Sequence, residues 1–293
     1  MTTARPYHDQ IDQERMLDLV RKRPAERVAA FPSVIDLQEM LGVAAIQAHT
    51  YLWEDERGAL LGYALLDDGM LAYEGAHEIE GEMLAWAEAD ARQAGWPSLD
   101  LNCREDDLTR LAALEAFGFN RLDEGGVYMS RTLLDPIPAP VLPPGFTIRP
   151  IAGEEEVEAH VAMHRAAWGT ENMTVEYRLS MMRTPTYERE LDLVAVAPDG
   201  RLAAYCMCYI SADENELSGH SVGYTDPVAT HPDFQGQGLA KALLLAGMEL
   251  LRTRGIDTVC LGTSRDNVAM QRAAAVVGFR VVSATVAWSK ALS

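Results

Sequence analysis

The stretch TDPVATHPDFQGQGLAKALLLAGMELL, from Thr225 to Leu251, decides the fold. It starts with an extended segment that ends at His231-Pro232, passes through a loop with Gly236 and Gly238, and becomes an apolar helix. The first N–H groups of a helix have no intrahelical partner, and the helix dipole places partial positive charge where they point. Because glycines let a ligand approach closely, this strand-to-helix turn predicts a phosphate-binding site.

Within the turn, Gln235, Gly238 and Ala240 spell Q/R-x-x-G-x-G/A, which is neither the P-loop nor the Rossmann pattern. With His231-Pro232 before it and Gly278-Phe279 downstream, the pattern resembles the GNAT superfamily of acyl-CoA-dependent N-acyltransferases. The resemblance implies that main-chain amides of the turn hold the CoA pyrophosphate and that the preceding strand runs beside the pantetheine arm. An ordinary glycine-containing turn is the simpler alternative.

On this resemblance the co-substrate is acetyl-CoA, and no metal is expected. The expected cofactor-binding residues are Val228, Ala229, Thr230, Gln235, Gly236, Gln237, Gly238, Leu239, Ala240, Lys241 and Asn267. A bulged strand in this family offers a backbone N–H to the oxyanion, which by position falls on 228–230. One such donor contributes about 2.7–4 kcal/mol. Asn267 also precedes a helix, where asparagine is a preferred cap, and the two roles are compatible.

Aminolysis of a thioester requires a group that takes a proton from the amine. Asp226 and Tyr224 precede the turn with strand parity, so they share one face of a regular strand and are the candidate catalytic residues. Since Pro227 follows directly, a turn-forming role for Asp226 is an equal alternative. Glu214 and Glu216 are the reserve carboxylates.

Many members of the family carry a tyrosine, as general acid, seven residues after the helix-opening asparagine. In this chain that position holds Ala274, which donates nothing. Solvent or one of Tyr205, Tyr209 and Tyr224 could protonate the thiolate instead, or it leaves unprotonated, because a thiol pKa around 8.5 makes a tolerable leaving group. The departure motivates an alternative function, a non-catalytic protein that binds or senses acyl-CoA.

The chain repeats one pattern twice. The matched positions are Gly95 with Gly255, Gly118-Phe119 with Gly278-Phe279, Arg5-Pro6 with Arg149-Pro150, and LLGYAL from Leu60 with LAAYCM from Leu202. The second copy carries about 18 extra residues between Cys208 and Asp226, either as one wall of a substrate pocket or as a surface insertion. In the first copy Glu78 and Glu80 stand at the positions of the turn and would repel a pyrophosphate. We therefore expect a degenerate first copy and a CoA-binding second copy, an arrangement that resembles double GNAT proteins of the mycothiol-synthase type.

Five prolines in residues 133–145 predict an extended linker. We expect a degenerate GNAT-like domain at 1–134, the linker at 135–145, and an acyl-CoA-binding domain at 146–293. The expected fold class is α/β of the mixed α+β kind, with two tandem GNAT-type domains, each a mixed, mostly antiparallel sheet flanked by helices. Periodicity predicts helices over 9–30, 78–94, 108–116, 154–167, 175–182, 239–254 and 267–277. It predicts strands over 45–53, 59–66, 99–103, 127–133, 191–197, 202–210, 222–230, 257–263 and 280–288.

The formal charge of −19 argues against nucleic acid as a partner and favours a cationic small-molecule amine or a basic peptide N-terminus, although acidic surfaces also simply provide solubility. No apolar run of about 18 residues or signal-peptide core occurs, so a cytoplasmic protein without membrane contact is expected. The four cysteines lack zinc-ligand spacing and are expected to be buried and reduced. His160 and His164 lack a third metal ligand. Two fused copies can satisfy each other, which favours a monomer over a dimer.

Overall fold

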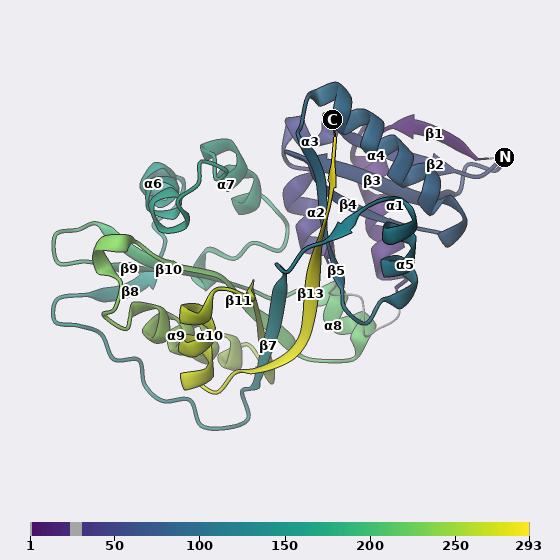
Figure 1. Cartoon of the computed structure of the whole chain (residues 1–293). Helices are drawn as coiled ribbons and strands as arrows, with labels where there is room; N and C mark the ends of the chain where they lie inside the picture. Colours follow the sequence, from purple (N-terminus) through teal and green to yellow (C-terminus); the bar gives the residue numbers. More distant parts are fainter. Residues whose placement is uncertain (1, 24–30, 293) are drawn as a thin grey trace. The chain divides into compact units, whose positions relative to one another are not determined.

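The computed structural model describes residues 2–23 and 31–292, and its chain path is drawn in Figure 1. The described residues form two compact units. Unit 1 draws on 1–126, 216–219 and 284–293, and unit 2 on 127–215 and 220–283. Helices and strands alternate in both, which is the mixed α/β class expected from the sequence.

Unit 1 contains a sheet in the order β1-β2-β3-β4-β5-β13. Its strands are β1 (Thr3–Pro6), β2 (Thr50–Glu54), β3 (Leu60–Asp67), β4 (Met70–Gly75), β5 (Ser98–Arg104), the short β6 (Asn120–Arg121) and β13 (Arg280–Ala291). Of β13, the part from residue 284 onward belongs to this unit. Its helices are α1 (Gln10–Arg21), α2 (Val34–Met40), α3 (Ala44–Ala48), η2 (His77–Ile79), α4 (Glu80–Ala94) and α5 (Leu108–Ala116). The β4–β5 pair is parallel, whereas β1–β2, β2–β3, β3–β4, β5–β13 and β6–β13 are antiparallel.

Unit 2 contains a sheet in the order β7-β12-β11-β10-β9-β8. Its strands are β7 (Gly126–Thr132), β8 (Thr147–Pro150), β9 (Asp192–Val196), β10 (Leu202–Tyr209), β11 (Val222–Thr230) and β12 (Thr258–Ser264). Its helices are η3 (Glu154–Glu156), α6 (Val157–Trp168), α7 (Val175–Met182), η4 (Arg189–Leu191), η5 (Pro232–Phe234), α9 (Leu239–Thr253) and α10 (Val268–Val276), and α8 (Ala212–Ser218) begins in this unit. The β11–β12 pair is parallel, whereas β8–β9, β9–β10 and β10–β11 are antiparallel.

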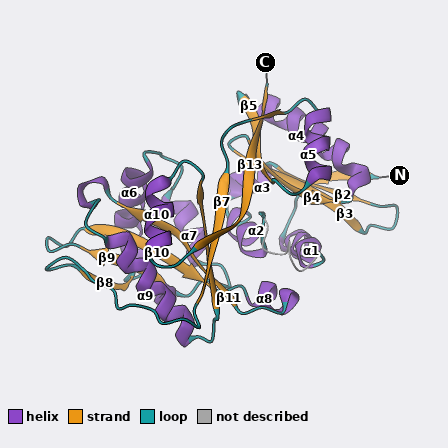
Figure 2. Ribbon diagram, turned by 60° about the horizontal axis from the view of Figure 1, so that its bottom comes forward, coloured by secondary structure: helices purple, strands orange, loops and turns teal. Residues whose placement is uncertain are grey.

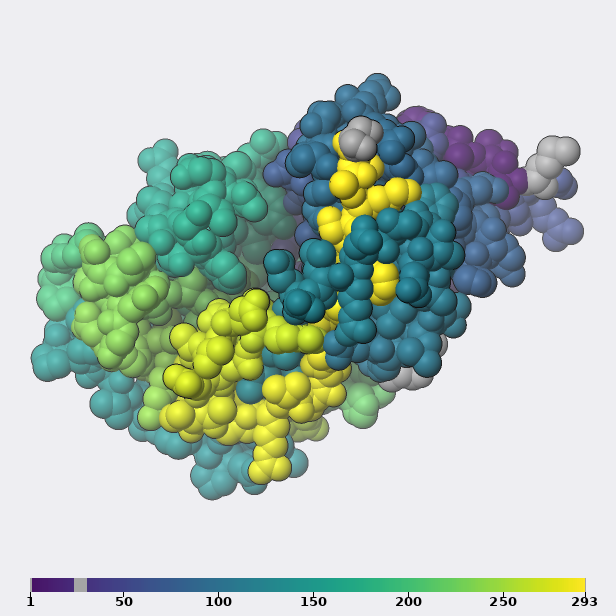
Figure 3. Space-filling model, viewed as in Figure 1, coloured from purple at the N-terminus to yellow at the C-terminus, as the bar shows by residue number. Residues whose placement is uncertain are grey.

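The last strands of the two copies are exchanged between the units. β7, the last strand of the first copy, lies beside β12 in unit 2, while β13 from the chain's C-terminus pairs with β5 from Thr285↔Arg104 to Ala291↔Ser98 in unit 1. In the space-filling view, the yellow C-terminal segment accordingly lies among blue and teal segments of unit 1 (Figure 3). The compact units therefore differ from the sequence repeats by one strand each, and the domain limits 1–134 and 146–293 remain a proposal about the repeats.

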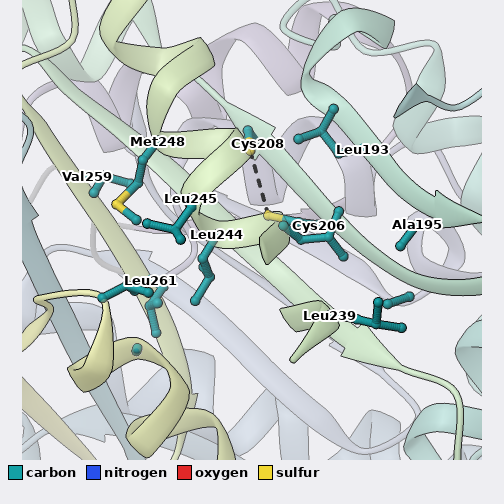
Figure 4. Close-up of a cluster of buried hydrophobic side chains, with 14 of the residues drawn as sticks. Leu193, Ala195, Cys206, Cys208, Leu239, Leu244, Leu245, Met248, Val259 and Leu261 are labelled. Atoms are coloured by element: carbon teal, nitrogen blue, oxygen red, sulfur yellow. Dashed lines mark hydrogen bonds between the residues drawn. The ribbon is translucent and has the colours of Figure 1, made fainter. Parts of the chain in front are cut away.

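Helices cover both faces of the unit 2 sheet (Figure 2). On one face, α9 buries Leu239, Leu244 and Met248 against strand residues such as Cys206 and Leu193 (Figure 4). On the other face, α6 and α7 cover a set that includes Val194, Tyr205 and Met207. Successive strand residues point to opposite faces, so the apolar runs of β9 and β10 serve both cores at once.

Several sequence expectations need correction. Residues 45–53 were expected as one strand, but Ala44–Ala48 forms helix α3 and the strand begins at Thr50, whose hydroxyl donates to the Ile46 carbonyl. The predicted helix over 9–30 is observed as Gln10–Arg21, and residues 24–30 lie outside the described part of the chain. Cys260 is only partly buried, unlike the other three cysteines, and all four are free thiols. Elements not expected from the sequence are β1, β4, β6, β8, α2 and α8.

Candidate active site

Strands β11 and β12 separate at the site. Their parallel pairing runs from Val222↔Thr258 to Tyr224↔Cys260 and stops there. On the other side of β11, Cys206 pairs with Val228 and Cys208 with Thr225, so β11 carries an extra residue in a bulge. A bulge bends its strand and interrupts the ladder. The rest of β11 therefore diverges from β12 and leaves one of its edges without that neighbour.

The open edge of β11 carries main-chain donors at alternate residues. His231 donates its backbone N–H to the Ala203 carbonyl of β10, which fixes the phase of the antiparallel hydrogen bonds. Because these bonds alternate along a strand, the N–H groups of Val228 and Thr230 point away from β10, toward the opening. The Thr230 carbonyl also faces outward, since it accepts from Gln235 Nε2 at 3.3 Å.

The turn after β11 presents an uncapped helix N-terminus. Gly236 and Gly238 have φ angles of 75° and 80°, a left-handed conformation that favours glycine. Gly238 is the N-cap of α9 and supplies no side chain to the first helical amides. These amides and the positive end of the dipole are therefore available to an anionic ligand.

A pocket of about 470 Å³ lies at this turn. Its lining includes ten of the eleven predicted cofactor-binding residues: Val228, Ala229, Thr230, Gln235, Gly236, Gly238, Leu239, Ala240, Lys241 and Asn267. Gln237 is not among the lining residues, and neither are Asp226 and Tyr224. The lining also includes Ala167, Trp168, Phe234, Ala269, Met270 and Ala273. Of these, only Trp168, directly after the helix predicted over 154–167, was singled out by the sequence, through the family resemblance, as near the acceptor lid or as core packing. No lining residue is acidic and Lys241 is basic, so the pocket suits a polyanion.

Asp226 bridges the two diverging strands. Its Oδ2 accepts the backbone N–H of Gly262 on β12 at 2.9 Å. A Cβ at position 262 would meet that oxygen at 3.1 Å, closer than ordinary van der Waals contact, so the close approach suits glycine. Asp226 thus fixes the opening between β11 and β12 by a side-chain bond where the main-chain ladder has ended.

Tyr224 is part of a separate polar cluster. Its hydroxyl donates to Glu214 Oε2 at 2.9 Å, and its ring stacks on Tyr209 with centroids 4.6 Å apart and planes 13° from parallel. Glu214 is 4% exposed and belongs to α8, which the extra segment of the second copy forms. The insertion therefore delivers a buried carboxylate to the last residue of β11 that still pairs with β12.

Helix α10 starts with the asparagine cap that the sequence predicted. Asn267 caps the helix by accepting the Met270 N–H at 3.1 Å, and it lines the pocket at the same time. Ala274 is fully buried and packs in the core of unit 2. The position at which family members often carry a tyrosine therefore holds no group that can donate a proton.

The equivalent turn in the first copy is shortened. Between β4 and α4 lie the four residues 76–79, whereas the eight residues 231–238 connect β11 to α9. Glu80, the first residue of α4, is buried and accepts from the Tyr73 hydroxyl at 2.7 Å and binds His77 Nδ1 at 2.9 Å. Loop length, more than the like charge expected from the sequence, distinguishes the two copies.

Two classes of site receive no support in the part of the chain that the structure describes. Within residues 2–23 and 31–292, no group of three or more His, Cys, Asp or Glu side chains is placed to hold a metal ion. Among the described helices, none combines the length and apolar character needed to cross a membrane.

Comparison with known proteins identifies the proteins that this chain resembles. Residues 155–279 match the model of the Acetyltransferase (GNAT) family. Mycothiol acetyltransferase of Saccharomonospora viridis is 28% identical over 252 residues, which cover 84% of this chain and 81% of that protein. Mycothiol acetyltransferase of Nocardiopsis dassonvillei is 29% identical over 195 residues, which cover 64% of this chain and 57% of that protein.

Solved structures resemble the whole described fold. A tandem GNAT protein from the clavulanic acid biosynthesis pathway has a TM-score of 0.71 at 20% identity, covering 100% of this chain and 98% of that chain. A GCN5-related N-acetyltransferase from Sphaerobacter thermophilus has a TM-score of 0.69 at 21% identity, covering 99% and 96%. At these identities the likeness shows the fold alone, which is a tandem GNAT fold.

Proposed function

Because the chain belongs to the GNAT superfamily and has a tandem layout of the mycothiol-synthase type, we propose that it transfers an acetyl group from acetyl-CoA to a primary amine. The acceptor is a small molecule or a peptide N-terminus. The reaction belongs to the second domain, residues 146–293, which the linker 135–145 joins to a degenerate first domain, 1–134. The observation that carries the proposal is the carboxylate-free pocket at the uncapped N-terminus of α9.

The residues of this pocket fit a nucleotide diphosphate. Main-chain amides of 235–241 hold the phosphates, and the Lys241 ammonium adds a positive charge at the lining. Asn267 offers its amide group at the opposite wall while its side-chain oxygen caps α10. The coenzyme supplies an activated acetyl thioester, and the chain supplies binding, orientation and proton transfer.

The open edge of β11 supports the acyl-transfer step. The N–H groups of Val228 and Thr230 point toward the opening, where an oxyanion develops as the amine attacks the thioester carbon. A main-chain donor of this kind needs no reorganisation during the reaction, and one donor contributes about 2.7–4 kcal/mol to the transition state. The bulge in β11 is thus the feature that frees the donors.

Proton removal from the amine is assigned to Asp226 and Tyr224. Tyr224 accepts the amine proton as its own hydroxyl proton passes to Glu214, which lies at hydrogen-bond distance. The Gly262 N–H orients the Asp226 carboxylate beside the opening, where it stabilises the cationic amine before attack. The thiolate leaves without a proton from position 274 and is protonated by solvent.

A thiol-release assay with acetyl-CoA and a panel of amines tests this function. The panel should include the amine that mycothiol acetyltransferases acetylate, because relatives bear that name. We expect release with at least one amine, and a large loss of kcat in Tyr224→Phe and Asp226→Asn. Tight CoA binding without release for any amine, and no effect of either substitution, would instead identify a protein that binds or senses acyl-CoA, the alternative that the buried Ala274 favours.

The remaining assignments follow from charge and composition. With a formal charge of −19, the surface favours a cationic acceptor and disfavours nucleic acid. The four free cysteines fit a reducing compartment, which supports a cytoplasmic protein. We propose a monomer, because each unit completes its sheet with a strand from the other copy, and light scattering tests this directly.

A further inference from the structure

The two copies can be aligned residue by residue through a repeated ion pair. In the first copy, Arg5 donates to Asp12 at 2.7 and 2.6 Å. In the second copy, Arg149 donates to Glu156 at 2.8 and 2.6 Å. Both pairs lie seven residues apart and join the first strand of a copy to its first helix. The constant offset of 144 residues therefore aligns α1 with α6.

This alignment shows two histidines at core positions. At the offset of 144, Met16 and Val20 of α1 correspond to His160 and His164 of α6. Met16 and Val20 are completely buried, as apolar residues on the inner face of a helix should be. His160 is 1% exposed, and neither of its ring nitrogens has a hydrogen-bond partner among the described residues. The second copy thus carries two imidazoles at core positions that the first copy fills with Met and Val.

A tyrosine that both copies share is connected differently in each. Tyr63 and Tyr205 correspond at the offset of 142. The Tyr63 hydroxyl is buried and has no hydrogen-bond partner among the described residues. The Tyr205 hydroxyl forms a hydrogen bond of 2.7 Å with His164 Nδ1. The histidine therefore connects Tyr205 to a group that the first copy lacks.

The His164 ring is neutral near pH 7, because burial, and then the charge of Arg178, lower its pKa to about 4. Tyr205 and His164 are therefore joined by a hydrogen bond between two neutral groups. The His164 ring is thereby held in one orientation. The His164 ring also stacks beside Trp168, with centroids 5.7 Å apart and planes 23° from parallel.

Trp168 connects this cluster to the pocket. It is the last residue of α6, is 49% exposed, and lines the pocket together with Val228 and Ala229. A half-exposed tryptophan at the end of a helix has freedom to change rotamer unless neighbouring groups hold it. The stacked His164 ring restricts the tilt of the indole, and the hydrogen bond from Tyr205 holds that ring in place.

We propose that His164 and Tyr205 are positioning residues that hold the Trp168 indole as one wall of the coenzyme pocket. This inference rests on the proposed coenzyme site. It assigns to the second copy a polar anchor that sets affinity for the coenzyme without touching it. The first copy, with Val20 at the histidine position, has no such anchor.

The test is calorimetric titration with CoA of the full chain and of four variants. Trp168→Ala removes the wall, and we expect the Kd for CoA to rise about tenfold, as is typical for truncating a tryptophan at a binding site. His164→Val introduces the residue of the first copy and Tyr205→Phe removes the hydroxyl. Each should raise Kd about three- to tenfold, because the pocket binds the coenzyme fully only during the fraction of time that the indole stays in place. Glu158→Gln on the exposed side of the same helix is the control, and it should leave Kd within about twofold.

A double variant separates positioning from general destabilisation. If His164 acts through the indole, His164→Val should have no further effect on Kd once Trp168 is alanine, because residues that act as a unit are not additive. The proposal would be overturned if the double variant raised Kd by the product of the two single increases. It would also be overturned if Kd were unchanged in both His164→Val and Tyr205→Phe. A Trp168→Ala variant that binds CoA normally would overturn it as well. If the unaltered protein binds no CoA, the proposed function itself fails, which is a separate outcome.

Discussion

Replacing Gly238 by alanine should weaken coenzyme binding at least tenfold while it lowers the stability of the fold only modestly. Gly238 has a φ of 80° and is the N-cap of α9, and no atom lies within 4 Å of a Cβ added there. An alanine thus meets no steric clash, and its cost is the strain of the left-handed conformation, about 1–2 kcal/mol. In a domain of this size each kcal/mol lowers Tm by about 2–4 °C.

The same strain acts differently on binding. If the alanine relaxes out of the left-handed region, the amides after Gly238 turn away from the phosphates. One lost hydrogen bond to a charged group costs about 1.5–3 kcal/mol, and 1.4 kcal/mol corresponds to a tenfold change in Kd. Calorimetry should therefore show the Kd for CoA to rise about tenfold or more.

Gly200 provides the matched control. It lies in the turn between β9 and β10, has a φ of 88°, and also has no atom within 4 Å of an added Cβ. Gly200→Ala should lower Tm by a similar amount and leave Kd unchanged. An unaltered Kd in Gly238→Ala, or an equal rise in Gly200→Ala, would refute the assignment of the phosphates to this turn.

Three further predictions follow from the site and the core. Burial lowers the pKa of His160 to about 2, so below pH 6.5 the unfolded chain binds more protons than the folded chain, and stability falls as the pH drops. His160→Met should remove about 2 kcal/mol of this loss at pH 5, which urea unfolding at pH 7.5 and pH 5 measures. Glu214→Gln should lower kcat more than KM, because the buried carboxylate receives the Tyr224 proton, whereas the exposed Glu216→Gln on the same helix should not; equal effects would contradict this role. Asn267→Ala should cost about 1 kcal/mol of stability as a lost cap and also raise the Kd for CoA; a loss of stability alone would leave Asn267 only a cap.

The candidate coenzyme site, which stays a prediction, could be singled out from the sequence where local chemistry determines it. The two glycines, the apolar helix behind them and the absence of carboxylates between Gln235 and Met248 are properties of one continuous stretch, and ten of the eleven expected residues line one pocket. The β11 bulge was expected from the family resemblance, and the register between β10 and β11 contains one.

Long-range features were not accessible in the same way. The exchange of β7 and β13 depends on which strand edges meet, and nothing in either strand's alternation identifies its neighbour. Strand parity put Asp226 and Tyr224 on one face, but the bulge falls beside Asp226, and the two side chains bind different partners, Gly262 and Glu214. The extra segment gave no sign of its structure, because its acidic, polar residues also suit a surface loop. The short helix α3 was mistaken for strand because five residues are too few to show helical periodicity.

Calorimetric titration of the full chain with CoA and with pantetheine tests the central claim most directly, since pantetheine lacks the diphosphate that the α9 turn is proposed to bind. We expect one CoA site per chain and at least a tenfold weaker binding of pantetheine. Two equivalent CoA sites per chain, equal affinity for the two ligands, or no binding of CoA would contradict it.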